Sequence, residues 1–286
     1  MCSALVPGDH GFSRRSAVVS AEVLYCGDTT LETAASYFAG VLTWSGRKFE
    51  YLRSDQNLAD SQLTDQLRLI VFSDYPAARV SHSVAERCRE RILAGCGLLM
   101  LGGWESFHGL GGDWETHPLA DLLPVTISDQ DDRVNFSSPC LVRPTNAESA
   151  APEAGQASPA VPGEAILAGL PWIESPPVLG GLNRVTAKPD STTLLTAEHY
   201  SARWCSNEAA GFEFRNRYPL LVVGSNGRGR VAALMTDLAP HWVGGWVDWG
   251  PERIVAQGPG AGAIEVGSHY AAFIRQLVDW TANNAT

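Results

Sequence analysis

The chain has 286 residues, of which 45% are hydrophobic and 18% charged, a composition that excludes a disordered protein. The formal net charge is −10 and basic residues form no stripe, which argues against a nucleic-acid surface. The longest apolar run, near 97–103, is far shorter than the roughly 20 residues of a membrane helix, and the N-terminus lacks the pattern of a signal peptide. We therefore expect a cytoplasmic protein with no membrane or nucleic-acid partner. These bulk properties do not indicate which small-molecule ligand it binds.

The first half of the chain predicts strands that alternate with helices. After a leader at 1–19, strands are expected at 21–28, 49–52, 67–74 and 97–101, each an apolar run. Helical spacing of apolar residues covers 31–42, and a second helix fits 83–94, with Ser83 as its N-cap and Gly95 as its end. Near-continuous apolar strands separated by helices indicate a parallel sheet with helices on both faces.

In parallel sheets the ligand site lies beyond the carboxyl ends of the strands. Three polar loops should therefore meet there, although they are far apart in the sequence. They are 27–30, which contains Asp28, 73–76, which contains Asp74, and the turn that begins with Gly102 and Gly103.

The second half resumes strand patterns after 144–164, a segment rich in Pro, Ala, Ser and Glu that we interpret as an exposed loop. A hairpin is predicted over 219–236, with Asn226 and Gly227 in its turn. An amphipathic helix at 268–282 ends the chain, and residues 20–286 are expected to form one domain.

The strand at 97–101 leads into a sequence typical of the sharp strand-to-helix turn that presents a nucleophile in α/β enzymes. Its residues are Gly102, Gly103, Trp104, Glu105, Ser106 and Phe107. Ser106 is a candidate nucleophile and Glu105 a candidate acid or base, but the spacing is not G-x-S-x-G. A plain turn that needs glycine for packing is the alternative.

Asp237 and His241 follow the predicted hairpin and would suit a carboxylate–imidazole pair that positions a base. An isolated loop histidine with a local hydrogen bond is the alternative. Trp242, Trp246 and Trp249 are either core residues or a stacking surface for a flat ligand such as a sugar.

Asp131, Asp132 and Arg133 form either a metal-binding carboxylate pair or a solvated, salt-bridged turn. His108 and His117 lie in a Gly-rich loop without the i, i+4 spacing of a zincin helix. Six cysteines are spread out without a C-x-x-C pair, so reduced, mostly buried thiols are expected. We expect no metal and no cofactor, with a metal-assisted hydrolase using His108, His117 or Asp131 as an alternative.

Four segments together resemble a bacterial family of glutamine-amidotransferase-like proteins. They are GCGLLMLGGWESFHGLGG, HPLADLLPVTISDQDDR, LGGLNRVTAKP and YPLLVVGSNGRGRVAALMTDLAPHW. The family belongs to the class I glutamine-amidotransferase-like superfamily, near its trehalose-utilisation-protein-like branch. The resemblance spans about 21–282 and implies a flavodoxin-like three-layer α/β/α sandwich, mostly parallel, with an added β-hairpin.

In the family that the chain resembles, catalytically active class I amidotransferases have a G-x-C-x-G motif at the turn and a His-x-Glu motif further along the chain. Here Trp104 or Glu105 stands where the thiol would be, and Trp242 follows His241. The chain thus lacks the usual cysteine nucleophile, and the resemblance names no reaction.

Two hypotheses follow for the function. An enzyme of this fold would use Asp74, Glu105 or His241 as acid or base, beside Asp28, Asp237 and Ser106. A non-catalytic, carbohydrate-related binding domain would use the same pocket, with Gly102, Gly103, Trp104, Phe107, Asp132, Arg133 and Trp242 as contacts. A homo-oligomer is compatible with either.

Overall fold

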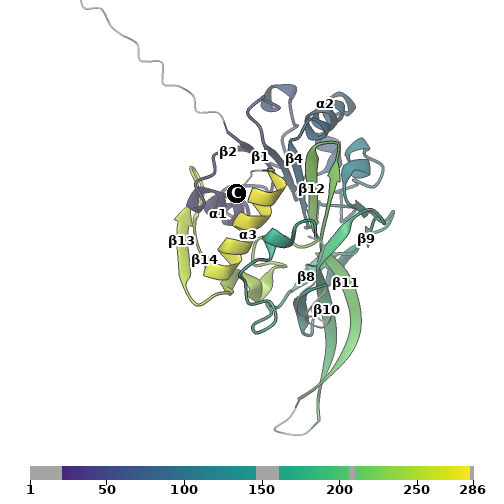
Figure 1. Ribbon diagram of the computed structural model, residues 1–286, viewed down its shortest axis with the longest axis vertical. Coiled ribbons are helices and arrows are strands. Elements are labelled where there is room, and N and C mark those ends of the chain that lie inside the picture. The colour runs from purple at the N-terminus through teal and green to yellow at the C-terminus, as the bar shows by residue number, and fades with distance from the viewer. Residues whose placement is uncertain (1–20, 146–160, 206–209, 284–286) are drawn as a thin grey trace, which may run out of the picture.

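The computed structural model describes residues 21–145, 161–205 and 210–283. The predicted leader at 1–19 and most of the predicted loop at 144–164 lie outside these residues. The described chain is a mixed α/β protein built on one large, mostly parallel sheet (Figure 1).

The large sheet has eight strands in the order β2-β1-β3-β4-β12-β11-β10-β7. Their bounds are β2 (Phe49–Leu52), β1 (Val23–Gly27), β3 (Leu69–Ser73), β4 (Gly97–Leu101), β12 (Gly229–Leu234), β11 (Ala210–Asn226), β10 (Thr192–Trp204) and β7 (Cys140–Pro144). The neighbours from β2 to β12 pair in parallel, and those from β12 to β7 pair antiparallel. The predicted parallel sheet with an added hairpin is therefore confirmed.

The α-helices of the described chain are α1 (Ala35–Trp44), α2 (His82–Leu93) and α3 (Ser268–Thr281). The predicted helix at 31–42 begins too early, because residues 31–34 form turns and α1 starts at Ala35. The predicted N-cap of α2 was also wrong: Ser81, and not Ser83, has extended backbone and accepts the Val84 N–H at its side chain.

Helices α2 and α3 approach the sheet from opposite sides. A Cβ on Gly97 of β4 would lie 2.0 Å from the Thr281 carbonyl oxygen of α3, whereas one on Gly229 of β12 would lie 2.2 Å from the Ile92 carbonyl oxygen of α2. Val231 pairs with Leu98, so these two glycines point to opposite faces. Glycine is needed at both positions because helix backbone lies against the strand.

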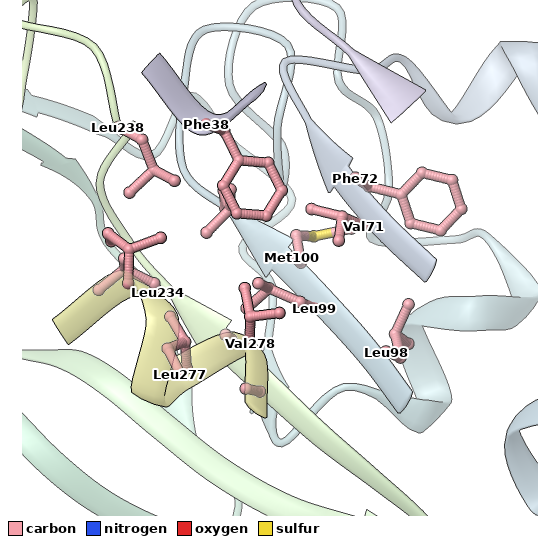
Figure 2. Close-up of a cluster of buried hydrophobic side chains, with 14 of the residues drawn as sticks. Phe38, Val71, Phe72, Leu98, Leu99, Met100, Leu234, Leu238, Leu277 and Val278 are labelled. Atoms are coloured by element: carbon pink, nitrogen blue, oxygen red, sulfur yellow. The ribbon is translucent and has the colours of Figure 1, made fainter. Parts of the chain in front are cut away.

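The core on the α3 side joins segments that are distant in the sequence. Figure 2 shows Phe38 of α1 near Leu99 of β4 and Leu234 of β12, with Leu277 and Val278 of α3 beneath them. All five side chains are at most 2% exposed. This packing helps to position the carboxyl ends of β4 and β12, and thereby the loops that follow them.

Three small antiparallel pairs surround the large sheet: β5 (Val125–Thr126) with β9 (Thr186–Ala187), β6 (Arg133–Asn135) with β8 (Gly181–Asn183), and β13 (Arg253–Gln257) with β14 (Ala263–Gly267). Short 3-10 turns complete the described chain at Asp60–Gln62, Ala77–Arg79, Pro118–Leu122, Glu164–Ile166 and Gly244–Asp248. The predicted strand-to-helix geometry after β4 is wrong. The chain passes through turns from Gly102 and reaches only the short Pro118–Leu122 turn.

The predicted hairpin at 219–236 is confirmed as β11 and β12, but β11 begins much earlier, at Ala210. It pairs with β10 from Ala210 to Val223, and the outer parts of the two strands extend together from the body of the molecule (Figure 1). Within the described residues, no helix has the length and apolar character needed to cross a bilayer.

Candidate active site at the carboxyl edge of the sheet

Four parallel strands end level with one another. Gly27 of β1 pairs with Ser73 of β3, Ser73 pairs with Leu101 of β4, and Leu101 pairs with Leu234 of β12. The loops that follow these strands must therefore meet at one edge. The predicted convergence of the Asp28, Asp74 and Gly102 loops is confirmed, and the loop carrying Asp237 joins them.

Asp28 and Asp74 occupy equivalent positions after neighbouring strands. Both have left-handed backbone, with φ of 43° and 47°, which is uncommon for a residue other than glycine. The Asp28 carboxyl group accepts a hydrogen bond from the Tyr25 hydroxyl at 2.5 Å and one from the Ser73 hydroxyl at 3.4 Å. Asp28 is 9% exposed, and Asp74 is partly buried.

The backbone of the turn after β4 holds the Asp74 carboxyl group. The Glu105 N–H donates to Asp74 Oδ1 at 2.8 Å, and the backbone of Trp104 provides a second hydrogen bond. A Cβ on Gly103 would lie 2.0 Å from the same oxygen, so only glycine leaves room for the carboxyl group. The turn therefore does form an anion-binding nest, but a side chain of the protein occupies it.

Ser106 supports this arrangement from below. Its hydroxyl oxygen accepts the Asp74 N–H at 2.9 Å, and the residue is 2% exposed. Phe107 is fully buried, with φ of 52°. The structure thus places both side chains under the turn, out of reach of a ligand at the surface.

Asn183 and Asp132 brace the turn from the β6–β8 side. Asn183 Oδ1 accepts the Gly103 N–H at 2.9 Å, and its Nδ2 donates to Asp132 Oδ1 at 2.7 Å. Asp132 also accepts the N–H groups of His108 and Gly109, both at 3.1 Å. Both side chains are fully buried. Asn183 has no separate signal in the sequence beyond its place in the LGGLNRVTAKP segment.

Asp237 and His241 lie beside each other at the same edge. His241 Nδ1 is 3.8 Å from Asp237 Oδ2, with the imidazole side chain 75% exposed and the carboxylate side chain 10% exposed. The backbone N–H groups of Trp242 and Val243 donate to Asp237 Oδ1 at 3.3 and 3.0 Å. The loop folds tightly around the carboxyl group and leaves the imidazole facing solvent.

The three aspartates share one electrostatic environment. Burial raises the pKa of Asp28 to about 6, and hydrogen bonds from Tyr25 and Ser73 oppose that rise. Burial, with the charge of Asp28, raises the pKa of Asp74 to about 7. Burial also raises the pKa of Asp237 well above its usual value, with contributions from Asp74 and Asp28. Asp28 and Asp74 therefore gain and lose protons close to neutral pH.

The aromatic residues of the candidate site divide into surface and core. Trp104 is 53% exposed, and the Arg133 guanidinium lies 4.5 Å from the centre of its ring. Trp242, Trp246 and Trp249 are buried, and Trp242 Nε1 donates to Asn135 Oδ1 at 2.8 Å. The open choice between core and stacking surface is resolved in favour of core for these three residues.

The two adjacent aspartates at 131 and 132 have different environments. Asp131 is exposed and forms an ion pair with Arg133 at 2.8 Å, whereas Asp132 belongs to the buried brace. Both ring nitrogens of His117 have partners within the protein: Nε2 lies 3.1 Å from the Val80 carbonyl, and Nδ1 accepts the Leu119 N–H at 3.3 Å.

Other chemistry-bearing features lie elsewhere. A cavity of about 550 Å³ is lined by residues of β7, β10 and the Glu164–Ile166 turn, and none of the aspartates lines it. Among the described cysteines, Cys26, Cys88, Cys96 and Cys140 are buried and Cys205 is exposed. Burial raises the pKa of Cys88, Cys96 and Cys140 to about 12, so these thiols are poor nucleophiles.

The fold and the three aspartates at the carboxyl edge of the large sheet define the class: an α/β protein with an acidic site at the ends of its parallel strands. The chain belongs to the family described as "Putative glutamine amidotransferase", whose model matches residues 69–253. The match runs from β3 to β13 and includes Asp74, the turn, the brace and Asp237. The resemblance inferred from the sequence is thereby confirmed.

Solved structures show the same fold at low sequence identity. Cytoplasmic protein STM1381 from Salmonella typhimurium LT2 is 21% identical, with 91% of this chain and 98% of its own covered and a TM-score of 0.64. Cytoplasmic protein STM3548 from Salmonella typhimurium is 23% identical over 77% and 89%, with a TM-score of 0.58. A "Putative thua-like protein" from Parabacteroides merdae is 12% identical, with 93% of this chain and 91% of its own covered and a TM-score of 0.50. No curated protein matches the chain.

Proposed function

We propose that this protein is an enzyme that performs acid–base chemistry on a small hydroxylated molecule, with Asp74 as the group that transfers the proton. The observation that carries the proposal is the position of the Asp74 carboxyl group in the amide nest of the turn, with its pKa raised to about 7. A general acid or base works best when its pKa lies near the working pH.

Glutamine hydrolysis is the less favoured reaction for this site. No cysteine occurs between Gly97 and Pro139, so the turn offers no thiolate to attack a carboxamide. The N–H groups of the turn, which would otherwise stabilise an oxyanion, bind Asp74 and Asn183 instead. The family's fold is kept here with different chemistry at its turn.

The chemistry of the edge favours a hydroxylated substrate. Asp28, Asp74 and Asp237 would repel an anion, while carboxyl groups that are partly protonated can both donate and accept hydrogen bonds with hydroxyl groups. The exposed indole of Trp104 beside them offers an apolar face to a sugar-like ring. These features support a carbohydrate-related substrate.

In this proposal His241 and Asp237 form a second proton-transfer unit. The buried carboxyl group would orient the exposed imidazole across a gap of 3.8 Å, which a small movement of the side chain closes to a hydrogen bond. The charge of Glu105 contributes to the raised pKa of Asp74, and burial raises the pKa of the Glu105 carboxyl group itself. Glu105 would assist Asp74 and not replace it.

The test is a turnover screen of the purified full-length chain with glycosides, sugars, esters and glutamine. We expect turnover of a hydroxylated substrate, which Asp74→Asn reduces by about 10²–10⁴-fold and His241→Ala reduces less. Asp129→Asn, an exposed aspartate in the described chain, is the matched control and should leave the rate unchanged. Turnover that survives Asp74→Asn, or ammonia release from glutamine at a comparable rate, would overturn the proposal.

A non-catalytic binding domain is the second candidate, favoured by the half-exposed indole of Trp104. Thermal-shift measurements against the same sugars separate the two. A stabilisation that Trp104→Ala abolishes, without turnover of any compound, would favour binding alone.

The finer structural expectations belong to the same proposal. We propose that residues 20–286 form one domain, a flavodoxin-like three-layer sandwich, supported by the approach of α2 and α3 to opposite faces and by a core that runs from β1 to α3.

The two Salmonella proteins are called cytoplasmic, which supports the same location for this chain. Exposed Trp204, Phe212 and Phe214 on the β10–β11 hairpin support a homo-oligomer.

A further inference from the structure

The loop after the candidate site brings three potential metal ligands together. His108, Asp113 and Glu115 each offer one ligand atom, and these atoms all lie within 4.8 Å of one another. His108 Nδ1 is 3.1 Å from Glu115 Oε2, and both side chains are about one-fifth exposed, at 21% and 20%. We propose that these three side chains bind a divalent transition-metal ion of the Zn²⁺ type.

The spacing of the ligand atoms suits such an ion. Nitrogen and oxygen ligands lie about 2.0–2.2 Å from zinc, which places two ligands of a tetrahedral site roughly 3.3 Å apart. The His108–Glu115 separation is close to that value, and the ligand atom of the exposed Asp113 lies within 4.8 Å of both. An imidazole ligand favours zinc and its neighbours over magnesium and calcium, which prefer oxygen ligands alone.

Hydrogen bonds and a buried tryptophan hold the backbone of this loop in place. Asp132 binds the N–H of His108, while the N–H groups of Gly112 and Asp113 both donate to the His108 carbonyl at 3.1 Å. Between Asp113 and Glu115, Trp114 is fully buried, and its Nε1 donates to the Tyr75 carbonyl at 2.8 Å. Binding the ion therefore requires little ordering of the backbone, which lowers the entropic cost of the site.

The same brace connects the two sites. Asp132 holds the His108 backbone with one oxygen and Asn183, which binds Gly103, with the other. Three protein ligands leave a coordination position open to water, as in zinc sites that carry out chemistry. The proposal does not depend on the reaction at Asp74, because it rests on a separate set of side chains.

The test is calorimetric titration of Zn²⁺ into the full-length protein after removal of metals with a chelator. We expect about one equivalent to bind, and a dissociation constant at least about 10-fold weaker in Glu115→Gln and in His108→Ala. His82→Ala, which removes an exposed histidine on α2, should bind as the original chain does. Mg²⁺ should give no comparable binding.

A spectroscopic measurement keeps the test independent of folding defects. Co²⁺ bound by these residues should give visible absorption bands, which Glu115→Gln alters at unchanged circular dichroism. Binding of less than one equivalent, equal affinity in Glu115→Gln and the original chain, or equal loss in His82→Ala would each overturn the proposal, the last by showing adventitious binding to surface histidines.

Discussion

Asp74 is the residue on which the proposed chemistry at the carboxyl edge of the sheet depends. Its backbone N–H binds the Ser106 hydroxyl, and its side chain is held by the turn after β4. Its charged form is opposed by burial and by the neighbouring Asp28. These opposing forces leave a carboxyl group that is half protonated near neutral pH, which no isolated aspartate would be.

Asp74→Asn should change how stability depends on pH. With a folded-state pKa of about 7 against an ordinary 3.8, the folded protein keeps a proton that the unfolded chain has released. The free energy of unfolding of the original chain should therefore fall as pH rises from about 4 to about 7, by about 1 to 4 kcal/mol through this group.

Urea unfolding at several pH values tests this prediction. The free energy of unfolding of Asp74→Asn should fall less with rising pH, so that its stability relative to the original chain increases. The control Asp129→Asn should show the same pH dependence as the original chain. Parallel curves for Asp74→Asn and the original chain would show that Asp74 has no raised pKa.

Gly103→Ala should damage the site through one methyl group. The added Cβ would lie 2.0 Å from Asp74 Oδ1 and force the carboxyl group out of the nest. We expect a loss of about 1–3 kcal/mol in unfolding free energy and loss of the proposed activity. Gly224→Ala, whose Cβ would meet neighbours only at 3.4 and 3.5 Å, is the control that should change little.

At the scale of the element, α2 shows how a local signal can select the wrong residue. Ser81 and Ser83 both precede the apolar face of Val84, Ala85, Cys88 and Ile92, and either suits an N-cap. Extended backbone at Ser81 decides between them.

Ser81→Ala should therefore cost about 1 kcal/mol of unfolding free energy, because it removes the acceptor for the Val84 N–H. Ser83→Ala lies inside the first turn and should cost clearly less. Chemical denaturation of both variants measures the difference. A larger loss in Ser83→Ala would move the start of the helix back to the predicted position.

Across the whole molecule, burial is concentrated in the central parallel strands. Every residue of β1, β3 and β4 is buried, whereas residues of β13 alternate between exposed and partly buried, and the first half of β11 is mostly exposed. Local opening requires less free energy where fewer apolar contacts are lost.

Hydrogen exchange should follow this division. We expect the slowest exchange in β1, β3 and β4 and faster exchange in β13 and in the outer part of the β10–β11 pair. Mass spectrometry of peptides from these segments measures it. Equal protection of β13 and β3 would show that the small sheet opens only when the whole molecule unfolds.

Much of the site's location could be predicted from single segments. Asp28 and Asp74 follow apolar strands directly, and parallel strands bring their carboxyl ends to one edge whatever their distance in sequence. The position of Asp237 was harder, because nothing local shows that β12 pairs with β4 across more than a hundred residues. The brace of Asn183 and Asp132 depends on β6 and β8, which are too short to predict from alternation.

The sequence by itself determined the fold class, the family and the absence of a cysteine from the turn, because residue type, periodicity and order along the chain carry that information. Only the tertiary structure decided that the amide nest of the turn binds Asp74, that Ser106 and Phe107 lie beneath it, and that three tryptophans belong to the core. The physical reason is that burial, hydrogen-bond partners and pKa depend on atoms contributed by strands far apart in the sequence. The gathering of His108, Asp113 and Glu115 has the same origin, since it depends on how a loop folds against Asp132.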